Sequence, residues 1–561
     1  MTAPRPLRLL ALLTALLLLF AACGGGGDDG GGGDDGGIQG ATTDEDEGEP
    51  VAGGEVTFGV ESETNAYSPH TFAGTAAGYN AAWLVFDPLI VRDEDGKLVP
   101  YLAESLEAND ALTEFTIKLR PNVTFHDGTK LTAQVQKAAF DEYLKNGPGT
   151  RRQSETKEVT SVDVIDDLTY KYVLAEGNAA WPDYLVGPIG WPFSVEAARA
   201  AGENFASKPV GTGPFILQEW TRDNQFVATK NPDYWQEGLP YLDKVTVRPI
   251  PDEDARGIAM QTGDIDGTHS VRLSQFLTQM RDLAREGTVK MYESPGNSGS
   301  GTIFNTTNPP LDDKRIRRAL AFAMRPAELI SVVAGEGATE PRTTYYAPES
   351  PWFSEKASKA YPVNDLAQAK KLYEEYVNDP KRSDGKAVGT PVSFEFACTA
   401  IPSLQAQAQA YQAMWKEVGF VVDLKPVEQS VHIQNAIEGK FQANCWRQGS
   451  DADPYTHLSV AHGDPAKNPG NFTNFSPPEL QALLTELRET ADFQKRYDAL
   501  EKIQLILSEE VPVVWTGGNN EFIVAKPDLK GIASWKTPDG VKGNGANGGI
   551  TFWSHVWRGQ G

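Results

Sequence analysis

Val392-Ser393-Phe394-Glu395-Phe396 opens the stretch of sequence that decides the fold of this chain. It is a short apolar run of the kind that forms a strand, and residues 405–418 after it place large apolar side chains on one helical face. Two more apolar runs follow at 421–424 and 441–446, with a short helical segment at 431–437 between them. This order is typical of right-handed crossovers on a parallel sheet, so the stretch predicts an α/β fold.

The same stretch indicates where a ligand would bind. Ligands of open α/β sheets collect at the carboxyl ends of the strands. Cys398 ends the first predicted strand, and residues 446–453 follow the third. We therefore expect a solute site at the rim that these residues form.

Elsewhere the chain continues to alternate short strands with amphipathic helices. Residues 55–60 and 115–120 are expected to be strands, and residues 365–377 a helix. The Ser-Pro-Pro-Glu segment at 476–479 is a helix start that leads into two successive helices. A body of about 510 residues is more than one hydrophobic core usually serves, so more than one lobe is expected.

The first 50 residues predict export. Arg5 and Arg8 precede an apolar run at 9–22, which is shorter than the roughly 20 residues that cross a bilayer. Residues 24–37 contain only Gly and Asp, and more acidic residues follow before Pro50. Such a segment has almost nothing apolar to bury, so it is expected to be a flexible acidic tether. The net charge of −25 argues against a nucleic-acid partner, which needs a basic face.

Residues 20–23, Phe-Ala-Ala-Cys, resemble a bacterial lipobox. The resemblance implies that residues 1–22 are removed and that Cys23 becomes an acylated first residue. Two or more acyl chains give stable membrane anchoring. The protein is then expected on the outer face of the cytoplasmic membrane, and the alternative is a plain secretory signal with an incidental Cys.

Six further segments carry a resemblance through their order along the chain. They are PYLAES (100–105), FHDGT (125–129), VGTGPF (210–215), NPDYW (231–235), QTGDID (261–266) and PLDDKRIRRALAFA (310–323). The ordered set resembles the family 5 substrate-binding lipoproteins of ABC importers, the peptide, dipeptide and nickel type. No single segment is specific, but together they cover nearly the whole body.

The resemblance implies a two-lobed α/β fold, the type II periplasmic-binding-protein-like fold with a subdomain inserted in the first lobe. The implied division is 1–22 for the signal peptide, 23–50 for the tether, 51–75, 206–303 and 513–561 for the first lobe, 76–205 for the insertion and 304–512 for the second lobe. It also implies a monomeric, non-catalytic receptor without cofactor or metal. Such a receptor encloses a peptide or similar solute and presents it to the transmembrane permease subunits and their ATPase.

The resemblance places the ligand-binding residues at the crossings between lobes and in the loop after the third strand. The candidates are Asn297, Ser298, Gly299, Trp446, Arg447, Ser450, Asp451 and Trp515. In peptide binders of this family, an Asp three residues before an Asp-Pro pair holds the peptide's amino group; that position is Ser450 here, and Asp451 lies next to it. The dipeptide type has an Arg before the helix near 405 that is absent here, which leaves Arg447 for a carboxylate. Trp446 and Trp515 either offer stacking surfaces or fill the core.

Cys398 and Cys445 end strands that are neighbours in this family's strand order, so the resemblance also implies that a disulfide between them is possible. We hypothesise that it forms and stiffens the rim of the second lobe.

Several residues suggest other chemistry. His126-Asp127-Gly128 is better explained as a turn than as an acid/base pair. Asp453 is expected to cap the next helix, and His457 and His462 are expected to lie in a solvated loop, because their spacing fits no zinc pattern. No nucleophile with a paired His emerges, so an extracellular hydrolase is the weaker alternative. A binder of oligosaccharides or metal chelates on the same scaffold stays open.

Overall fold

The computed structural model describes residues 48–72, 74–146, 156–271, 274–294, 299–449, 453–468, 470–519 and 521–559. The predicted export signal, Cys23 and the tether as far as residue 47 lie outside these ranges. Within them, no helix combines the length and the apolar character needed to cross a bilayer.

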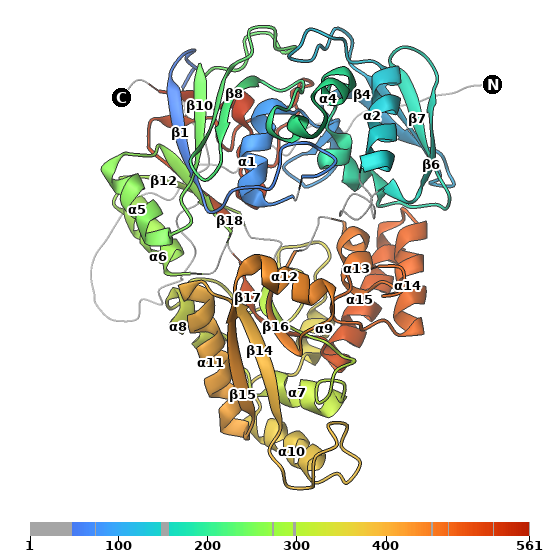
Figure 1. Ribbon diagram of the computed structural model, residues 1–561, viewed down its shortest axis with the longest axis vertical. Coiled ribbons are helices and arrows are strands. Elements are labelled where there is room, and N and C mark those ends of the chain that lie inside the picture. Colours follow the sequence, from blue (N-terminus) through green and yellow to red (C-terminus); the bar gives the residue numbers. More distant parts are fainter. Residues whose placement is uncertain are drawn as a thin grey trace, which may run out of the picture. The chain divides into compact units, whose positions relative to one another are not determined.

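The first large sheet has seven strands in the order β12, β18, β11, β1, β10, β9, β8 (Figure 1). Their bounds are Lys290–Ser294, Glu521–Ala525, Gly267–Ser270, Glu55–Val60, Lys244–Pro249, Gln225–Lys230 and Phe215–Thr221. β1 has the predicted bounds and runs parallel to β10 and β11.

Helices cover both faces of this sheet. Side chains alternate between the two faces along a strand, and apolar residues of β18 occur on both faces, so each face needs a cover. Ile523 and Ala525 of β18 pack in the cluster that contains α1 (Ala76–Val85). Phe522 and Val524 point the other way and pack with α5 (Glu253–Thr262) and α6 (Gln275–Arg285).

The second large sheet has five strands in the order β15, β14, β16, β13, β17. Their bounds are Val421–Val427, Ser393–Thr399, Ala443–Gln448, Gly299–Phe304 and Val513–Gly518. β14 is parallel to β15 and to β16, as the sequence predicts, and α11 (Pro402–Val418) and α12 (Gln429–Ile437) are the crossover helices.

Further helices of the described chain lie around this sheet (Figure 1). They are α7 (Lys314–Phe322), α8 (Pro326–Ala334), α9 (Glu355–Ala360), α10 (Leu366–Val377), α13 (Pro454–His462), α14 (Pro478–Glu489) and α15 (Phe493–Glu510). α14 and α15 are the predicted helix pair, and α10 is the predicted helix at 365–377. A single large apolar cluster joins the sheet to most of these helices.

A smaller antiparallel sheet has the order β4 (Ala103–Ala108), β5 (Glu114–Leu119), β7 (Thr169–Leu174), β6 (Val159–Val164). It has its own apolar cluster, packs against α2 (Ala133–Asn146) and falls within the predicted insertion. The chain after β18 returns to it, because Phe552 stacks on Trp535 at 4.2 Å and meets Tyr101 edge-on. Other short elements are β2 (Ile90–Arg92), β3 (Leu98–Pro100), α4 (Val195–Ala201), β19 (Leu529–Lys530) and β20 (Trp557–Arg558), together with 3-10 helices such as Trp181–Val186.

The chain passes between the two large sheets after β12 and again after β17. β13 and β17 pair with each other and lie entirely in the five-stranded sheet. The predicted division instead assigns residues 299–303 and 513–518 to the first lobe. Strand pairing groups residues 299–304 and 513–518 with the five-stranded sheet, and the lobe boundaries themselves stay predictions.

Candidate functional site

The predicted site residues that the structure describes lie together on three neighbouring strands. Gly299 of β13 is opposite Gln448 of β16 and Gly518 of β17. One and two residues further along β13, the partners on β16 are Arg447 and Trp446, and Trp515 faces Gly301 from β17. This end of the five-stranded sheet is where the chain crosses to the other sheet. Asn297, Ser298, Ser450 and Asp451 lie outside the described residues.

Trp515 belongs to the hydrophobic core. It is 4% exposed, and its ring meets Tyr345 edge-on at 4.7 Å. A Cβ at Gly299 would come within 3.1 Å of the Trp515 ring, so glycine lets the indole lie against the main chain of β13. The low exposure of Trp515 therefore fits a role in filling the core better than a role as a stacking surface for a solute.

Trp446, unlike Trp515, keeps a partly exposed surface. One side of the ring stacks on His432 at 5.7 Å, and Phe472 meets it edge-on at 5.0 Å. His432 Nε2 donates to the carbonyl oxygen of Cys445 at 3.0 Å, and burial lowers the pKa of this imidazole. The His432 ring is therefore a neutral aromatic support for Trp446.

Cys398 and Cys445 form the hypothesised disulfide. Their strands β14 and β16 are parallel neighbours, which brings the two Cα atoms to 4.9 Å, within the usual range for a disulfide. Both residues are buried. Cys398 lies near the end of β14, as predicted, but Cys445 lies inside β16, which continues to Gln448, so the bond joins the two strands before the rim.

Arg447 is exposed, and its Nη1 donates a long hydrogen bond of 3.4 Å to the carbonyl oxygen of Val271, beside β11 of the seven-stranded sheet. It therefore reaches across from one sheet to the other at the crossing.

Arg342 is a residue of this site that sequence reasoning missed. Pro341 bridges to Gly517 at the end of β17, and this pairing brings Arg342 over Gly518 with only 7% of its surface exposed. Desolvation lowers the pKa of its guanidinium, and the charges of Glu521 and Glu349 act in the opposite direction. No sequence pattern marks this position, because it depends on pairing with a strand far along the chain.

Ser300 and Asn519 connect the two crossings. The Ser300 hydroxyl donates to Oδ1 of Asn519, which immediately follows β17. Glu521, 9% exposed, then opens β18. Polar groups from both crossings thus lie close to the glycines at the ends of β13 and β17.

The turn predicted at 126–128 is present. Asp127 accepts hydrogen bonds from the main chain and side chain of Thr129 and from Ser194, and Gly128 has a φ of 82°. The carboxylate is used within the turn and lies in no acid/base pair with His126, whose Nε2 bonds the carbonyl oxygen of Gly213.

Asp453 caps α13, as predicted, since its Oδ1 accepts from the main chain of Tyr455 at 2.9 Å. The solvated loop expected for His457 and His462 is wrong, because both lie on α13 and His462 is fully buried. Burial lowers the pKa of His462 to about 3, and the Tyr345 hydroxyl forms a hydrogen bond of 2.7 Å with its Nε2. Within the described residues, no group of three His, Cys, Asp or Glu side chains is placed to hold a metal.

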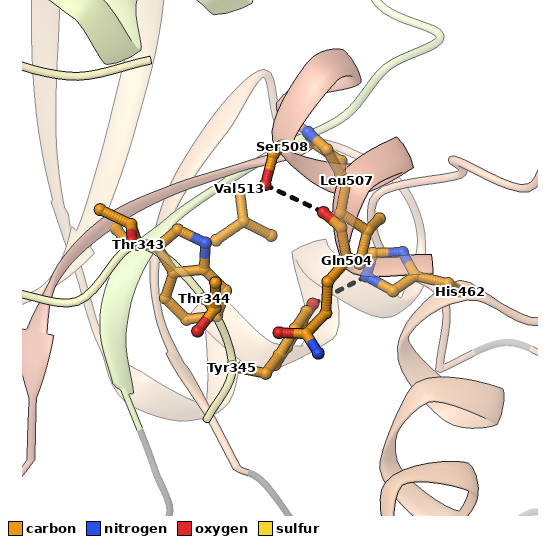
Figure 2. A pocket seen from close by; sticks show the side chains of 10 residues that line it. Thr343, Thr344, Tyr345, His462, Gln504, Leu507, Ser508 and Val513 are labelled. Carbon is orange, nitrogen blue, oxygen red and sulfur yellow. Dashed lines mark hydrogen bonds between the residues drawn. The ribbon is translucent and has the colours of Figure 1, made fainter. Parts of the chain in front are cut away.

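A small cavity lies beside this histidine (Figure 2). Tyr345, His462, Gln504, Ser508 and Trp515 are among the residues that line it. Its volume of about 10 Å³ suits roughly one water molecule. It is far too small for a peptide, so it is no candidate for the solute site.

A family comparison decides what kind of protein carries this arrangement. Residues 97–468 match the model of the bacterial extracellular solute-binding proteins, family 5 (middle), and this is more than half of the chain. The chain is a family 5 solute-binding protein.

Curated relatives of this solute-binding protein include the glutathione-binding protein GsiB of Shigella boydii serotype 4 (strain Sb227), with 29% identity over 304 residues. The match covers 53% of this chain and 58% of the relative. GsiB of Escherichia coli O1:K1 matches to the same extent, with 29% identity over 304 residues. The matched part thus spans little more than half the length of these relatives.

Solved structures agree over nearly the whole chain. DppA from Helicobacter pylori in complex with the peptide STSA has a TM-score of 0.78 at 20% identity, over 91% of this chain and 99% of DppA. AppA from Bacillus subtilis in complex with a nonapeptide has a TM-score of 0.77 at 21% identity, over 91% of this chain and 100% of AppA. The binding protein AgaA from A. tumefaciens R10 in complex with agropinic acid has a TM-score of 0.77 at 23% identity, over 91% of this chain and 99% of AgaA. This solute-binding protein therefore has the predicted two-lobed α/β fold of type II periplasmic binding proteins.

Proposed function

We propose that this protein is the extracytoplasmic substrate-binding component of an ABC importer and captures a peptide or a solute of similar size between two lobes. The observation that carries the proposal is the match to the family 5 solute-binding model over residues 97–468. The curated relatives named for glutathione, a small peptide, support a solute of this class.

In this mechanism the solute holds the two lobes together. Among the described strands, β13 follows β12 after four residues and β18 follows β17 after two, so the chain passes between the large sheets over short lengths. A solute that contacts both sides binds the closed form better than the open form, and this difference in affinity drives closure. The closed form is then presented to the transmembrane subunits, and ATP is hydrolysed by their partner ATPase. The receptor releases its solute chemically unchanged.

The proposed solute contacts are Gly299, Trp446 and Arg447, together with Asn297, Ser298, Ser450 and Asp451. Trp446 supports the proposal through its partly exposed ring on a neutral aromatic base. Asp451 is proposed to pair with the amino group of a peptide. Trp515 takes part only indirectly, through the packing of β13 and β17.

The proposal includes the chain's attachment and division. Cys23 carries the acyl chains, residues 24–50 form the tether, and the folded monomer works at the outer face of the membrane. Residues 76–205 form a subdomain inserted in the first lobe.

A thermal-shift screen tests the function. Three pools are added to the mature protein: di- to hexapeptides, oligosaccharides, and nickel chelates. A ligand that binds only the native state stabilises it by about 2.7 kcal/mol at 100 times its Kd, so the peptide pool is expected to raise Tm by several degrees. Stabilisation by another pool alone reassigns the solute class, and catalytic turnover of any pool would favour a hydrolase.

A further inference from the structure

The disulfide lies where two neighbouring strands separate. β14 pairs with β16 at two positions, residues 396–397 opposite residues 443–444. Beyond these positions β14 stays paired with β15, and β16 stays paired with β13. Cys398 and Cys445 are the next residues on the two strands, so the covalent bond takes the place of the ladder where the ladder ends.

Trp446 and its aromatic support come from opposite sides of this separation. Trp446 lies on β16, which beyond the disulfide is paired with β13 among the strands that the structure describes. His432 lies on α12, which begins two residues after the end of β15 and contacts β14. The stacked rings, and the hydrogen bond from His432 Nε2 to the carbonyl oxygen of Cys445, therefore bridge the two sides.

Both interactions need the two sides of the sheet at a fixed separation. Ring contacts and hydrogen bonds weaken strongly when the partners move apart by about 1 Å. The disulfide holds the Cα atoms of Cys398 and Cys445 at 4.9 Å, at the residue next to Trp446. The covalent bond thus fixes the spacing on which the contact of His432 with Trp446 depends.

We propose that the Cys398–Cys445 disulfide is a positioning element for solute binding, because it keeps His432 against Trp446 and thereby orients the Trp446 ring toward the solute. The inference rests on the proposed function of solute capture, with Trp446 as one of the contacts. It goes beyond a contribution to stability, since the affinity for solute then depends on the bond through one side chain.

A double-mutant cycle between the disulfide and Trp446 tests this role. Wild type, W446A, C398S/C445S and the triple variant are prepared as mature protein, and native mass spectrometry measures the bound fraction of a tripeptide pool during a titration. C398S/C445S is expected to weaken binding about fivefold. W446A is expected to weaken binding about tenfold in the wild type but no more than about twofold in C398S/C445S, because coupled residues are not additive.

The His432 imidazole gives a second readout that needs no solute. The chain has seven histidines, so labelling with carbon-13 at histidine alone gives few NMR signals, and H432Q assigns the signal of His432. The stacked indole shifts this signal through its ring current, and W446A removes that shift. C398S/C445S is expected to move the signal from its wild-type position toward its position in W446A.

I316A is the control for lost stability. Ile316 is buried on α7, which packs with α10, and its truncation is expected to cost about as much unfolding free energy as loss of the disulfide. I316A is expected to keep the affinity within about twofold and to leave the His432 signal in place.

Chemical reduction keeps the test valid if C398S/C445S does not fold. A water-soluble phosphine cleaves the S–S bond of the wild type, is oxidised to the phosphine oxide by taking up the oxygen of water, and leaves two thiols. The reduced wild type is expected to show the same loss of affinity and the same change in the His432 signal. The charge-state distribution in native mass spectrometry reports whether each form is folded.

An effect of W446A of about tenfold in both backgrounds overturns the inference while solute capture stands. Full affinity or an unchanged His432 signal without the disulfide does the same. So does an equal loss of affinity in I316A, because lost stability would then explain the effect. If the wild type binds no peptide of the pool, peptide capture is overturned and the inference with it.

Discussion

The main-chain nitrogen of Ala179 donates a hydrogen bond of 2.8 Å to the carbonyl oxygen of Arg488. Ala179 lies between β7 and the short helix at Trp181–Val186, and Arg488 is in the last turn of α14, so the bond joins the four-stranded sheet's loop to the helices of the five-stranded sheet. Arg488 also pairs with Glu176 at 2.7 Å, and Ala180 is buried in the large apolar cluster of the second sheet. The loop of the four-stranded sheet thus contacts the helices of the five-stranded sheet at a place other than the chain crossings.

The contact predicts a salt-sensitive contribution to solute retention. Because Glu176 is 68% exposed, the pair is worth at most about 1 kcal/mol, and salt screens it. R488E places two acidic groups together and is expected to raise the solute dissociation rate about two- to fivefold at low salt, measured by stopped-flow fluorescence. K359E is the control, because Lys359 pairs with Glu355 on an exposed helix. A dissociation rate that R488E leaves unchanged at every salt concentration would show that the contact does not hold the closed form.

The buried carboxyl of Asp87 is expected to make the unfolding free energy of the protein depend on pH. Burial raises the pKa of this carboxyl to about 7, against hydrogen bonds from Trp235, Tyr234 and Thr212. The folded state therefore holds the proton more tightly than the unfolded chain, whose Asp pKa is about 3.9. The stabilisation of the folded state by the protonated Asp87 carboxyl is fully present below about pH 4. It is lost as the pH rises to about 7, and the loss in unfolding free energy is no more than about 4 kcal/mol.

Urea unfolding of the wild type and of D87N between pH 4 and pH 8 measures this contribution. The wild type is expected to lose stability relative to D87N across that window, and the difference should level off above about pH 7. The exposed Asp95 supplies the control variant D95N. A difference between wild type and D87N that is constant with pH would contradict the prediction.

The disulfide predicts a stability loss on its removal. It closes a loop with a sequence separation of 47 residues, for which loss of chain entropy in the unfolded state gives about 4 kcal/mol and typical measured values are about 2–4 kcal/mol. The double variant C398S/C445S is expected to lose that much free energy of unfolding. If mass spectrometry finds both thiols free in natively exported protein, the bond does not form.

Substitution of the two tryptophans at the sheet end is expected to affect different properties: stability for Trp515 and solute binding for Trp446. W515A removes a core ring that is 4% exposed and is expected to cost about 3–5 kcal/mol in unfolding free energy. W446A removes a partly exposed ring and is expected to weaken solute binding about tenfold, with a much smaller loss of stability. Chemical denaturation and calorimetric titration separate the two effects. Full solute affinity in W446A would remove this residue from the proposed site.

Local patterns were sufficient to predict the α/β unit around β14. Its apolar runs and helical face are local signals, and the observed bounds differ by a few residues; α11 starts earlier than predicted because Pro402 is tolerated in the first turn. The burial of His462 was not predictable, since it depends on helix α13 packing over Tyr345. Arg342 was missed for the same reason, because a turn-rich segment becomes part of the site only by pairing with β17.

The central claim is that two halves enclose a solute and release it unaltered. Native mass spectrometry of the exported protein, purified without refolding, tests this most directly. The account predicts one bound molecule of peptide size that is released intact on denaturation and rebinds with the same mass. A protein that carries no such molecule, and takes up none from the peptide, oligosaccharide or chelate pools, would contradict it.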